Sequence, residues 1–321
     1  MRIVSLLPGA TEIVFALGLG DDLVAVSHEC DFPHAAKSLP AVTRSLIPAG
    51  ASSGEIDRVV RERVGSRSPL YALDVDALEA LRPDVIITQA LCDVCAVSEE
   101  DVHAVARRLT VRPDVINLET RSFIGLLDGI RQVAGRTGRE RAGEELIGAL
   151  RQRATQVEIR STARTRDTRV VFLEWLDPLF AGGHWNPELI RMAGGSDPFG
   201  QRGMPARTVL WADIEAFQPE VVFVACCGFT VDRTLEDLPA LTGMPGWSDL
   251  PAVRQGRVYI ADGAQYFSRP GPRLVDSLEM LAHAIDPGLH ELPAGVPAAR
   301  RVRQQDPGTY HVPESPTTQT C

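Results

Sequence analysis

A long stretch without proline, from Arg139 to Arg164, constrains this chain more than any other feature. Its apolar residues recur three or four positions apart, at Ala142, Leu146, Ile147, Leu150, Ala154 and Val157. That spacing places them on one face of a helix, so the sequence predicts a helix roughly 35 to 40 Å long. Strand and helix patterns alternate both before and after it. The helix is therefore predicted to join two α/β lobes.

The length of the chain agrees with two lobes, because 321 residues exceed the size at which a single core usually stops growing. We predict two Rossmann-like lobes with parallel sheets. The tail is rich in Pro, Gly, Ser, Thr and Gln, which predicts disorder. The expected domains are an N-terminal α/β lobe (1–121), connecting helices that include the interlobe helix (122–164), a C-terminal α/β lobe (165–290) and a disordered tail (291–321).

The two halves carry a weak internal repeat. LEALRPDVIITQALC in the first half resembles IEAFQPEVVFVACCG in the second, and RIVSLLP and RVVFLEW open the two halves alike. Each longer segment predicts a helix, a buried strand and a cysteine-bearing loop. Ligands of parallel α/β sheets bind beyond the carboxyl ends of the strands, so we expect these loops to meet in one cleft between the lobes.

Charge and composition exclude several classes of protein. The net charge of -9 argues against a nucleic-acid partner. No G-x-S-x-G, H-E-x-x-H or G-x-G-x-x-G motif occurs, so the chain is not expected to be an enzyme and no catalytic residue is assigned. No run of 18 apolar residues predicts a membrane span. We expect a monomer.

The first residues, MRIVSLLPGATEIVFALGL, read as a strand followed by a helix and not as a secretory signal. The spacing of the six cysteines is also not that of a small secreted disulfide framework. Both observations predict a cytoplasmic protein.

Aromatic and polar residues gather in the loops of the expected cleft. The aromatic set is Phe32, Trp175, Phe180, Trp185, Phe229, Tyr266 and Phe267, and the polar set is His28, Glu29, Asp31, His184, Glu188, Arg269 and Arg273. Aromatic walls suit a large flat apolar ligand, although each ring could equally belong to a core. The predicted ligand-binding residues are Pro8, His28, Glu29, Phe32, Cys92, Trp175, His184, Trp185, Phe229, Tyr266 and Arg269.

Five cysteines are expected near the same cleft. Two alternatives stay open for them: they ligate zinc, an iron–sulfur cluster or a metal presented by the ligand, or they are inert buried thiols. The candidate metal ligands are Cys92, Cys95, Cys226, Cys227 and Cys30.

Several segments together resemble a known family. They are SLLPGATEIVFALGLGDDLVAVSHECDFP, RPDVIITQ followed by CDVCAVS, FLEWLDPLFAGGHWNPEL, GWSDLPAVRQGRVYIADG and RPGPRLVD. Across about residues 2 to 288 the chain resembles the cobalamin-binding branch of the iron-chelate and cobalamin substrate-binding proteins that serve ABC importers.

That resemblance implies a corrinoid or similar metal chelate held between two α/β lobes, with little hinge motion. It also implies an ABC permease as partner, met by one surface carboxylate from each lobe, for which Glu55 and Glu188 are candidates. The expected function is a non-enzymatic cobalamin-binding protein that acts in import or in intracellular corrinoid handling. The alternatives are a metal- or cluster-containing redox protein or enzyme, and a siderophore or haem binder.

Overall fold

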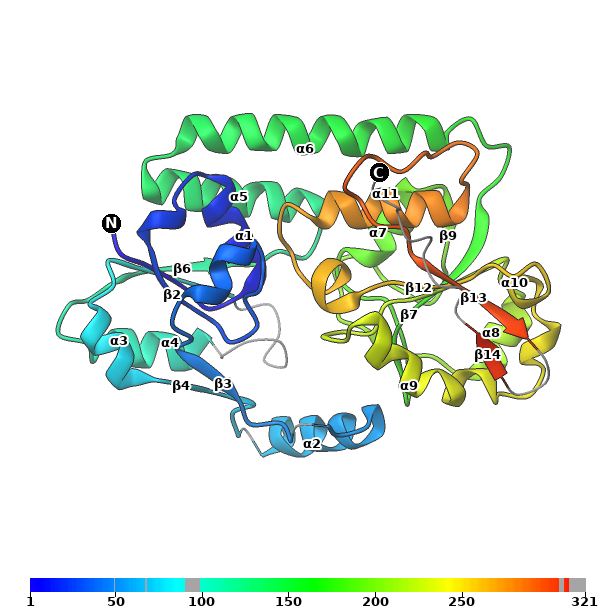
Figure 1. The fold of residues 1–321 in the computed structure, drawn as a ribbon, viewed down its shortest axis with the longest axis horizontal. Coiled ribbons are helices and arrows are strands. Elements are labelled where there is room, and N and C mark those ends of the chain that lie inside the picture. Colours follow the sequence, from blue (N-terminus) through cyan, green and yellow to red (C-terminus); the bar gives the residue numbers. More distant parts are fainter. Residues whose placement is uncertain (49, 67, 90–98, 306–308, 312–321) are drawn as a thin grey trace, which may run out of the picture. The chain divides into compact units, whose positions relative to one another are not determined.

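The computed structural model describes residues 1–48, 50–66, 68–89, 99–305 and 309–311 (Figure 1). The chain divides into two compact units. Unit 1 comprises Met1–Arg153 together with Arg269–Val275, and unit 2 comprises Ala154–Ser268 together with Asp276–Cys321. Each unit is built from alternating strands and helices, which confirms the predicted fold class. The short segment that returns to unit 1 near the end of the chain has no counterpart in the predicted boundaries.

Unit 1 is built on a parallel sheet with the strand order β2-β1-β5-β6. All five residues of β5 are buried, as expected for an apolar strand in the middle of a parallel sheet. Thr43–Ser45 and Tyr71–Leu73 form a separate antiparallel pair, β3 and β4. The strands of the main sheet are β1 (Ile3–Ser5), β2 (Leu23–Val26), β5 (Val85–Gln89) and β6 (Asp114–Leu118).

Helices of unit 1 begin and end at recognisable capping residues. The Ser122 hydroxyl accepts a hydrogen bond from the Gly125 N–H at the start of α5, and Gly138 ends that helix in the left-handed conformation. Figure 1 shows α1 and α5 side by side, and the two helices are in contact. The helices are α1 (Pro8–Ala16), α2 (Ser53–Gly65), α3 (Val75–Leu81), α4 (Glu99–Ala106) and α5 (Phe123–Thr137), with short 3-10 turns η1 (Gly20–Asp22) and η2 (His34–Ser38).

The long helix is confirmed as α6, Glu140–Ser161. Its buried apolar residues are those of the predicted face: Ile147, Leu150, Ala154 and Val157. The chain passes from unit 1 to unit 2 within this helix, between Arg153 and Ala154.

Unit 2 contains a mixed sheet with the order β10-β8-β7-β11-β12-β13-β14, and β9 pairs with β7. The central strands β7, β11 and β12 are parallel, as predicted, whereas β8, β10 and β13 join antiparallel. The strands are β7 (Thr168–Leu176), β8 (Leu179–Ala181), β9 (Gly195–Ser196), β10 (Arg207–Thr208), β11 (Val221–Val224), β12 (Val258–Ile260), β13 (Arg300–Gln305) and β14 (Thr309–His311).

The helices of unit 2 cover this sheet and contribute to its core. Trp247, Leu238 and Ile214 from three different elements pack in one buried cluster with strand residues such as Val222 and Ile260. The elements are α7 (Asn186–Met192), α8 (Trp211–Phe217), α9 (Val231–Thr242), α10 (Pro251–Arg254) and α11 (Leu274–Ile285), with the short turns η3 (Trp247–Asp249) and η4 (Gly263–Phe267), the latter a π-helix. The first two residues of α11 belong to unit 1.

Part of the predicted disordered tail is ordered, so the expectation of disorder across 291–321 is wrong for β13. Val302 is 2% exposed and pairs with Val258 of β12. The polar composition of the tail conceals an Arg-Val-Arg alternation, and alternation places one apolar side chain on the core face of a sheet. Residues 306–308 and 312–321 lie outside the described part.

The internal repeat is a repeat of structure. Arg82 and Gln218 end α3 and α8 in the left-handed conformation, and a proline and an acid follow each of them. The acid accepts a hydrogen bond from a backbone N–H at the start of the first strand of its unit. Asp84 accepts from Arg2, just before β1, at 2.7 Å, and Glu220 accepts from Arg169, near the start of β7, at 3.1 Å. The same device thus sets the register of β1 against β5 and of β7 against β11.

Candidate functional site

In unit 2, backbone hydrogen bonds join the end of β7 to the segment after β11, and that segment to the one after β12. The Cys227 N–H donates to the Glu174 carbonyl, and the Ala264 N–H donates to the Phe229 carbonyl, both at 3.0 Å. A Cβ at Gly263 would lie 2.0 Å from the Cys226 carbonyl oxygen, so only glycine permits this approach. The carboxyl edge of this sheet is therefore a rigid surface, and in α/β proteins this edge is where ligands bind.

Two predicted aromatic residues meet on this edge. The ring centroids of Trp175 and Phe229 are 4.9 Å apart with the planes tilted by 43°, and both side chains are partly exposed. The guanidinium of Arg233 lies 4.3 Å from the Phe229 centroid. The Trp175 indole N–H donates to the Asp177 carbonyl at 3.0 Å, which fixes the ring. We call Trp175 and Phe229 the aromatic pair. Tyr266, also partly exposed, lies in η4 beyond β12.

Trp185 and His184 are placed differently from the aromatic pair. Trp185 is 4% exposed, and its indole N–H donates to the Phe267 carbonyl at 2.9 Å. Its ring therefore supports the core of unit 2 and offers little surface to a ligand. His184 has a positive φ of 53°, and its backbone N–H donates to the Met204 carbonyl. Phe267 is likewise a core residue, 5.4 Å from the Phe172 ring centroid.

Glu174, which the sequence analysis did not select, ties two parts of this surface together. One carboxylate oxygen accepts from the Gly183 N–H at 2.8 Å and from the Asn186 amide at 3.3 Å. Burial raises the pKa of this carboxyl to about 7, even though these two hydrogen bonds lower it. An acid next to Trp175 at the end of a buried strand was the available signal. Glu174 orders the loop that carries His184.

In unit 1, the segment after β2 carries the predicted residues His28, Glu29 and Phe32. The His28 ring nitrogen Nδ1 lies 2.7 Å from the Thr43 hydroxyl, and partial burial lowers the histidine pKa, so the ring is neutral at pH 7. Phe32 is 42% exposed. Pro8, at the start of α1, is partly exposed.

The returning segment Arg269–Val275 packs onto these residues. Arg269 is 7% exposed, pairs with the Asp31 carboxylate and donates to the Glu29 carbonyl at 3.2 Å. A Cβ at Gly9 would lie 2.7 Å from the Pro270 carbonyl oxygen, so the segment needs glycine there to approach α1. Arg269, predicted to contact ligand, thus holds the loop after β2.

Arg273 makes the second attachment of this segment. Its guanidinium donates to the Glu12 carboxylate at 2.6 and 3.1 Å, and it lies 3.8 Å from the Phe32 ring centroid. Arg273 and Glu12 are 8% and 4% exposed. Sequence reasoning did not select Glu12, because nothing near it in the chain identifies a partner 261 positions away.

The described cysteines are buried or partly buried. Burial raises the pKa of Cys30 to about 11 and that of Cys226 to about 12, so both are neutral thiols at pH 7. Cys30 accepts a hydrogen bond from the Thr11 hydroxyl at 3.1 Å. Within the residues that the structure describes, no group of three or more His, Cys, Asp or Glu residues could hold a metal ion. Cys92 and Cys95 lie outside the described residues.

The two carboxylates considered for a permease contact differ in accessibility. Glu188 is 6% exposed and pairs with Arg202 at 2.7 Å. Glu55 is exposed on α2 and forms a capping box with Ser52 at the start of that helix. Of the two, only Glu55 presents a carboxylate on the surface.

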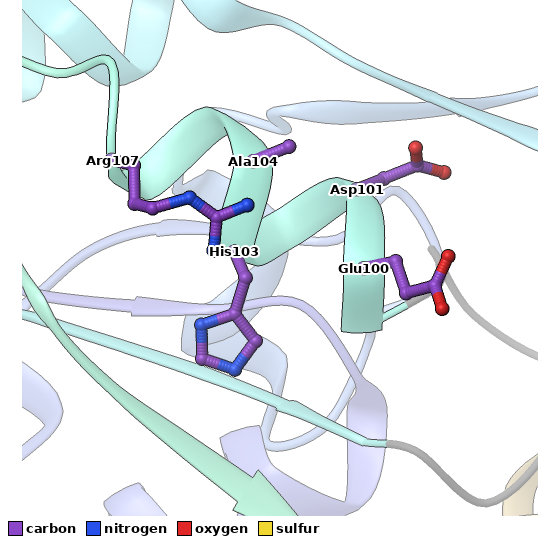
Figure 2. Close-up of a pocket in the computed structure, with 5 residues that line it drawn as sticks. All are labelled: Glu100, Asp101, His103, Ala104 and Arg107. Atoms are coloured by element: carbon purple, nitrogen blue, oxygen red, sulfur yellow. The ribbon is translucent and has the colours of Figure 1, made fainter.

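A hollow on unit 1 is lined by other residues. Figure 2 shows the side chains that line it, which come from α4 and the residue that follows it: Glu100, Asp101, His103, Ala104 and Arg107. Most of them are charged and exposed. This lining is unsuited to a large apolar ligand, and none of the predicted ligand-binding residues takes part in it.

Comparison with known proteins confirms the family predicted from the sequence. Residues 3–264 match the family described as periplasmic binding protein. The vitamin B12-binding protein of Vibrio cholerae serotype O1 is 25% identical over 284 residues, which cover 87% of each chain. An uncharacterized ABC transporter substrate-binding lipoprotein of Bacillus subtilis is 23% identical over 301 residues, covering 89% of this chain and 80% of the relative.

Solved structures share the fold. The periplasmic vitamin B12-binding protein BtuF of Vibrio cholerae superposes with a TM-score of 0.63 at 23% identity, covering 88% of this chain and 96% of that one. A periplasmic haem-binding protein from Pseudomonas aeruginosa superposes with a TM-score of 0.71 at 20% identity, covering 95% and 99%.

These findings correct the predicted cytoplasmic location. The matching family is described as periplasmic, and the Bacillus relative is named a lipoprotein, so the cytoplasmic assignment is wrong. The prediction rested on the absence of a signal-like pattern in the first residues and on the cysteine spacing. Those first residues form β1 and α1, the strand and helix expected from the sequence. None of the helices in the described part combines the length and apolarity that crossing a bilayer requires.

Proposed function

The chain belongs to the periplasmic binding protein family, and from this premise we propose that it binds cobalamin or a related corrinoid and releases it chemically unchanged. The observation that carries the proposal is the aromatic pair, two rings 4.9 Å apart on the carboxyl edge of the unit 2 sheet. A corrinoid is a broad, flat metal chelate, and rigid aromatic side chains bind such ligands through large contact areas. The vitamin B12-binding relative over 87% of the chain supports the same ligand class.

The described residues take distinct parts in this proposal. On unit 2 the partly exposed rings are those of Trp175, Phe229 and Tyr266. Unit 1, taken by itself, exposes the ring of Phe32. Trp185, Arg269 and His184 hold backbone segments in place, as their contacts in the fold indicate.

We further propose that the bound ligand is delivered to an ABC permease, since the Bacillus relative is named as a substrate-binding component of such a transporter. Glu55, exposed at the start of α2, is the candidate contact on unit 1. Pull-down of the purified permease by the wild-type chain but not by a Glu55→Arg variant would support this assignment.

Titration calorimetry with cyanocobalamin, haemin and a ferric siderophore tests the ligand. We expect one corrinoid per chain, and mass spectrometry of the released ligand should show it unaltered. Trp175→Ala should weaken binding by about 1 to 3 kcal/mol, because it removes one member of the aromatic pair.

The matched control is Trp211→Ala, another partly exposed tryptophan of unit 2, which lies on α8 and donates to the Pro245 carbonyl. The Trp211 ring packs against Trp247, with ring centroids 6.1 Å apart, whereas Trp175 packs against Phe229, and replacement of Trp211 should leave affinity unchanged. Binding of haemin or the siderophore without any corrinoid binding would contradict the proposed ligand. Equal affinity of the wild type and Trp175→Ala would remove the aromatic pair from the site.

A further inference from the structure

An exposed aromatic ring in unit 1 rests on a buried charge. Phe32 is 42% exposed, and the ring lies 3.8 Å from the guanidinium carbon of Arg273, whose side chain is 9% exposed. Single exposed apolar side chains are common and need no special cause. The feature that requires an explanation is the arginine beneath the ring.

The arginine is itself held by a buried acid. Glu12 on α1, with a side chain 2% exposed, accepts two hydrogen bonds from the Arg273 guanidinium. Burying an ion pair costs desolvation energy that the attraction between the charges only partly offsets, so such pairs contribute more to geometry than to stability. A planar guanidinium fixed at one edge by a carboxylate can present its face to a ring, which a flexible lysine cannot do equally well.

Phe32 occupies a position where an oriented ring would be useful. It lies in the loop after β2, at the carboxyl edge of the parallel sheet of unit 1. One ring face is taken by Arg273, and the exposed remainder is available for stacking. Unit 2 repeats the arrangement at its own carboxyl edge, where Arg233 lies 4.3 Å from the Phe229 centroid and pairs with Asp237 at 3.0 Å.

We propose that Arg273, fixed by Glu12, is a positioning residue that orients the Phe32 ring as a stacking platform for the flat face of a metal-chelate macrocycle. The identity of the macrocycle rests on the proposed function, whereas the orientation of the ring by Arg273 does not. Arg273 touches the platform and not the ligand. Its replacement should therefore act on affinity only through Phe32.

A double-mutant cycle measures that dependence. Calorimetry with cyanocobalamin on Phe32→Leu, Arg273→Lys and the double variant should show about tenfold weaker binding for Phe32→Leu and about fivefold for Arg273→Lys. The double variant should bind no more weakly than Phe32→Leu. The matched control is Arg164→Lys, a partly buried arginine that contacts Asp286 and Thr168 in unit 2, and its affinity should equal that of the wild type.

A second measurement reports on the environment of the Phe32 ring in the absence of any ligand. Fluorine NMR of protein labelled with fluorophenylalanine gives one signal per phenylalanine, and loss of a signal in Phe32→Leu assigns position 32. In Arg273→Lys that signal should move toward the value of free fluorophenylalanine and broaden, while it stays in place in Arg164→Lys.

The two measurements separate the possible failures. If no corrinoid binds the wild type, the proposed ligand is wrong, and the fluorine signal alone decides the role of Arg273. An unchanged Phe32 signal in Arg273→Lys would overturn the inference, as would additive losses of affinity in the cycle or wild-type affinity in Arg273→Lys.

Discussion

Glu12 and Arg273 form an ion pair across 261 positions of the chain, with side chains 2% and 9% exposed. The pair fastens the returning segment to α1 in unit 1. Removing one partner of a buried pair leaves the other charge without compensation, which is far more costly than losing a surface pair.

Glu12→Gln should therefore lower the free energy of unfolding by about 3 to 5 kcal/mol, measured by urea denaturation at pH 7. The control is Glu145→Gln, since Glu145 pairs with Arg141 where the side chains are 65% and 93% exposed. That variant should be indistinguishable from the wild type. Equal stability of Glu12→Gln and Glu145→Gln would show that the buried pair does not hold the segment.

Strand β13 contributes to the core of unit 2. Val302→Ala should destabilise the protein by about 1 to 3 kcal/mol, because Val302 is 2% exposed within the main cluster. Leu210→Ala, at a side chain 69% exposed, should change stability by less than about 0.5 kcal/mol. A Val302→Ala variant as stable as Leu210→Ala in urea titrations would return β13 to the predicted disordered tail.

Glu174 predicts a pH dependence of stability. Its folded-state pKa of about 7 lies above the ordinary value of 4.5, so the folded protein binds the proton more tightly than the unfolded chain. The stabilisation is complete below the ordinary pKa and is lost as the pH rises through 7. As the pH rises from 4.5 to 8, the free energy of unfolding of the wild type should therefore fall by about 1 to 3 kcal/mol relative to that of Glu174→Gln, which has no carboxyl to titrate.

The measurement is urea denaturation of both proteins across that pH range. Asp197, with a pKa raised by burial to about 6, contributes a loss of the same sign but is present in both proteins and cancels in the difference. Parallel stability curves for the wild type and Glu174→Gln would contradict the raised pKa.

The buried thiols predict a pattern of chemical reactivity. With pKa values of about 11 and 12, Cys30 and Cys226 should resist iodoacetamide at pH 8 in the folded protein, because alkylation requires the thiolate. Cys227, which is partly exposed, should react first of the three. Peptide mapping before and after denaturation reads the result, and rapid labelling of Cys30 or Cys226 in the folded state would count against neutral buried thiols.

The elements that could be predicted from the sequence depend on neighbours in the chain. The face of α6 follows from apolar residues three and four positions apart, and β5 follows from a short apolar run soon after Pro83. The repeat of helix, left-handed cap, proline, acid and strand is equally local. Helical periodicity and turn chemistry operate over a few residues, so the residues themselves determine them.

Tertiary structure decided which of two similar residues keeps an exposed surface and which is buried in the core. Trp175 lies near the end of β7 and is partly exposed. Trp185 is 4% exposed, and its indole N–H donates to the Phe267 carbonyl. Arg273 and Glu12 come together because the chain re-enters unit 1 after completing most of unit 2. Such contacts depend on the route of the backbone through space, and no pattern within a short window of sequence records that route.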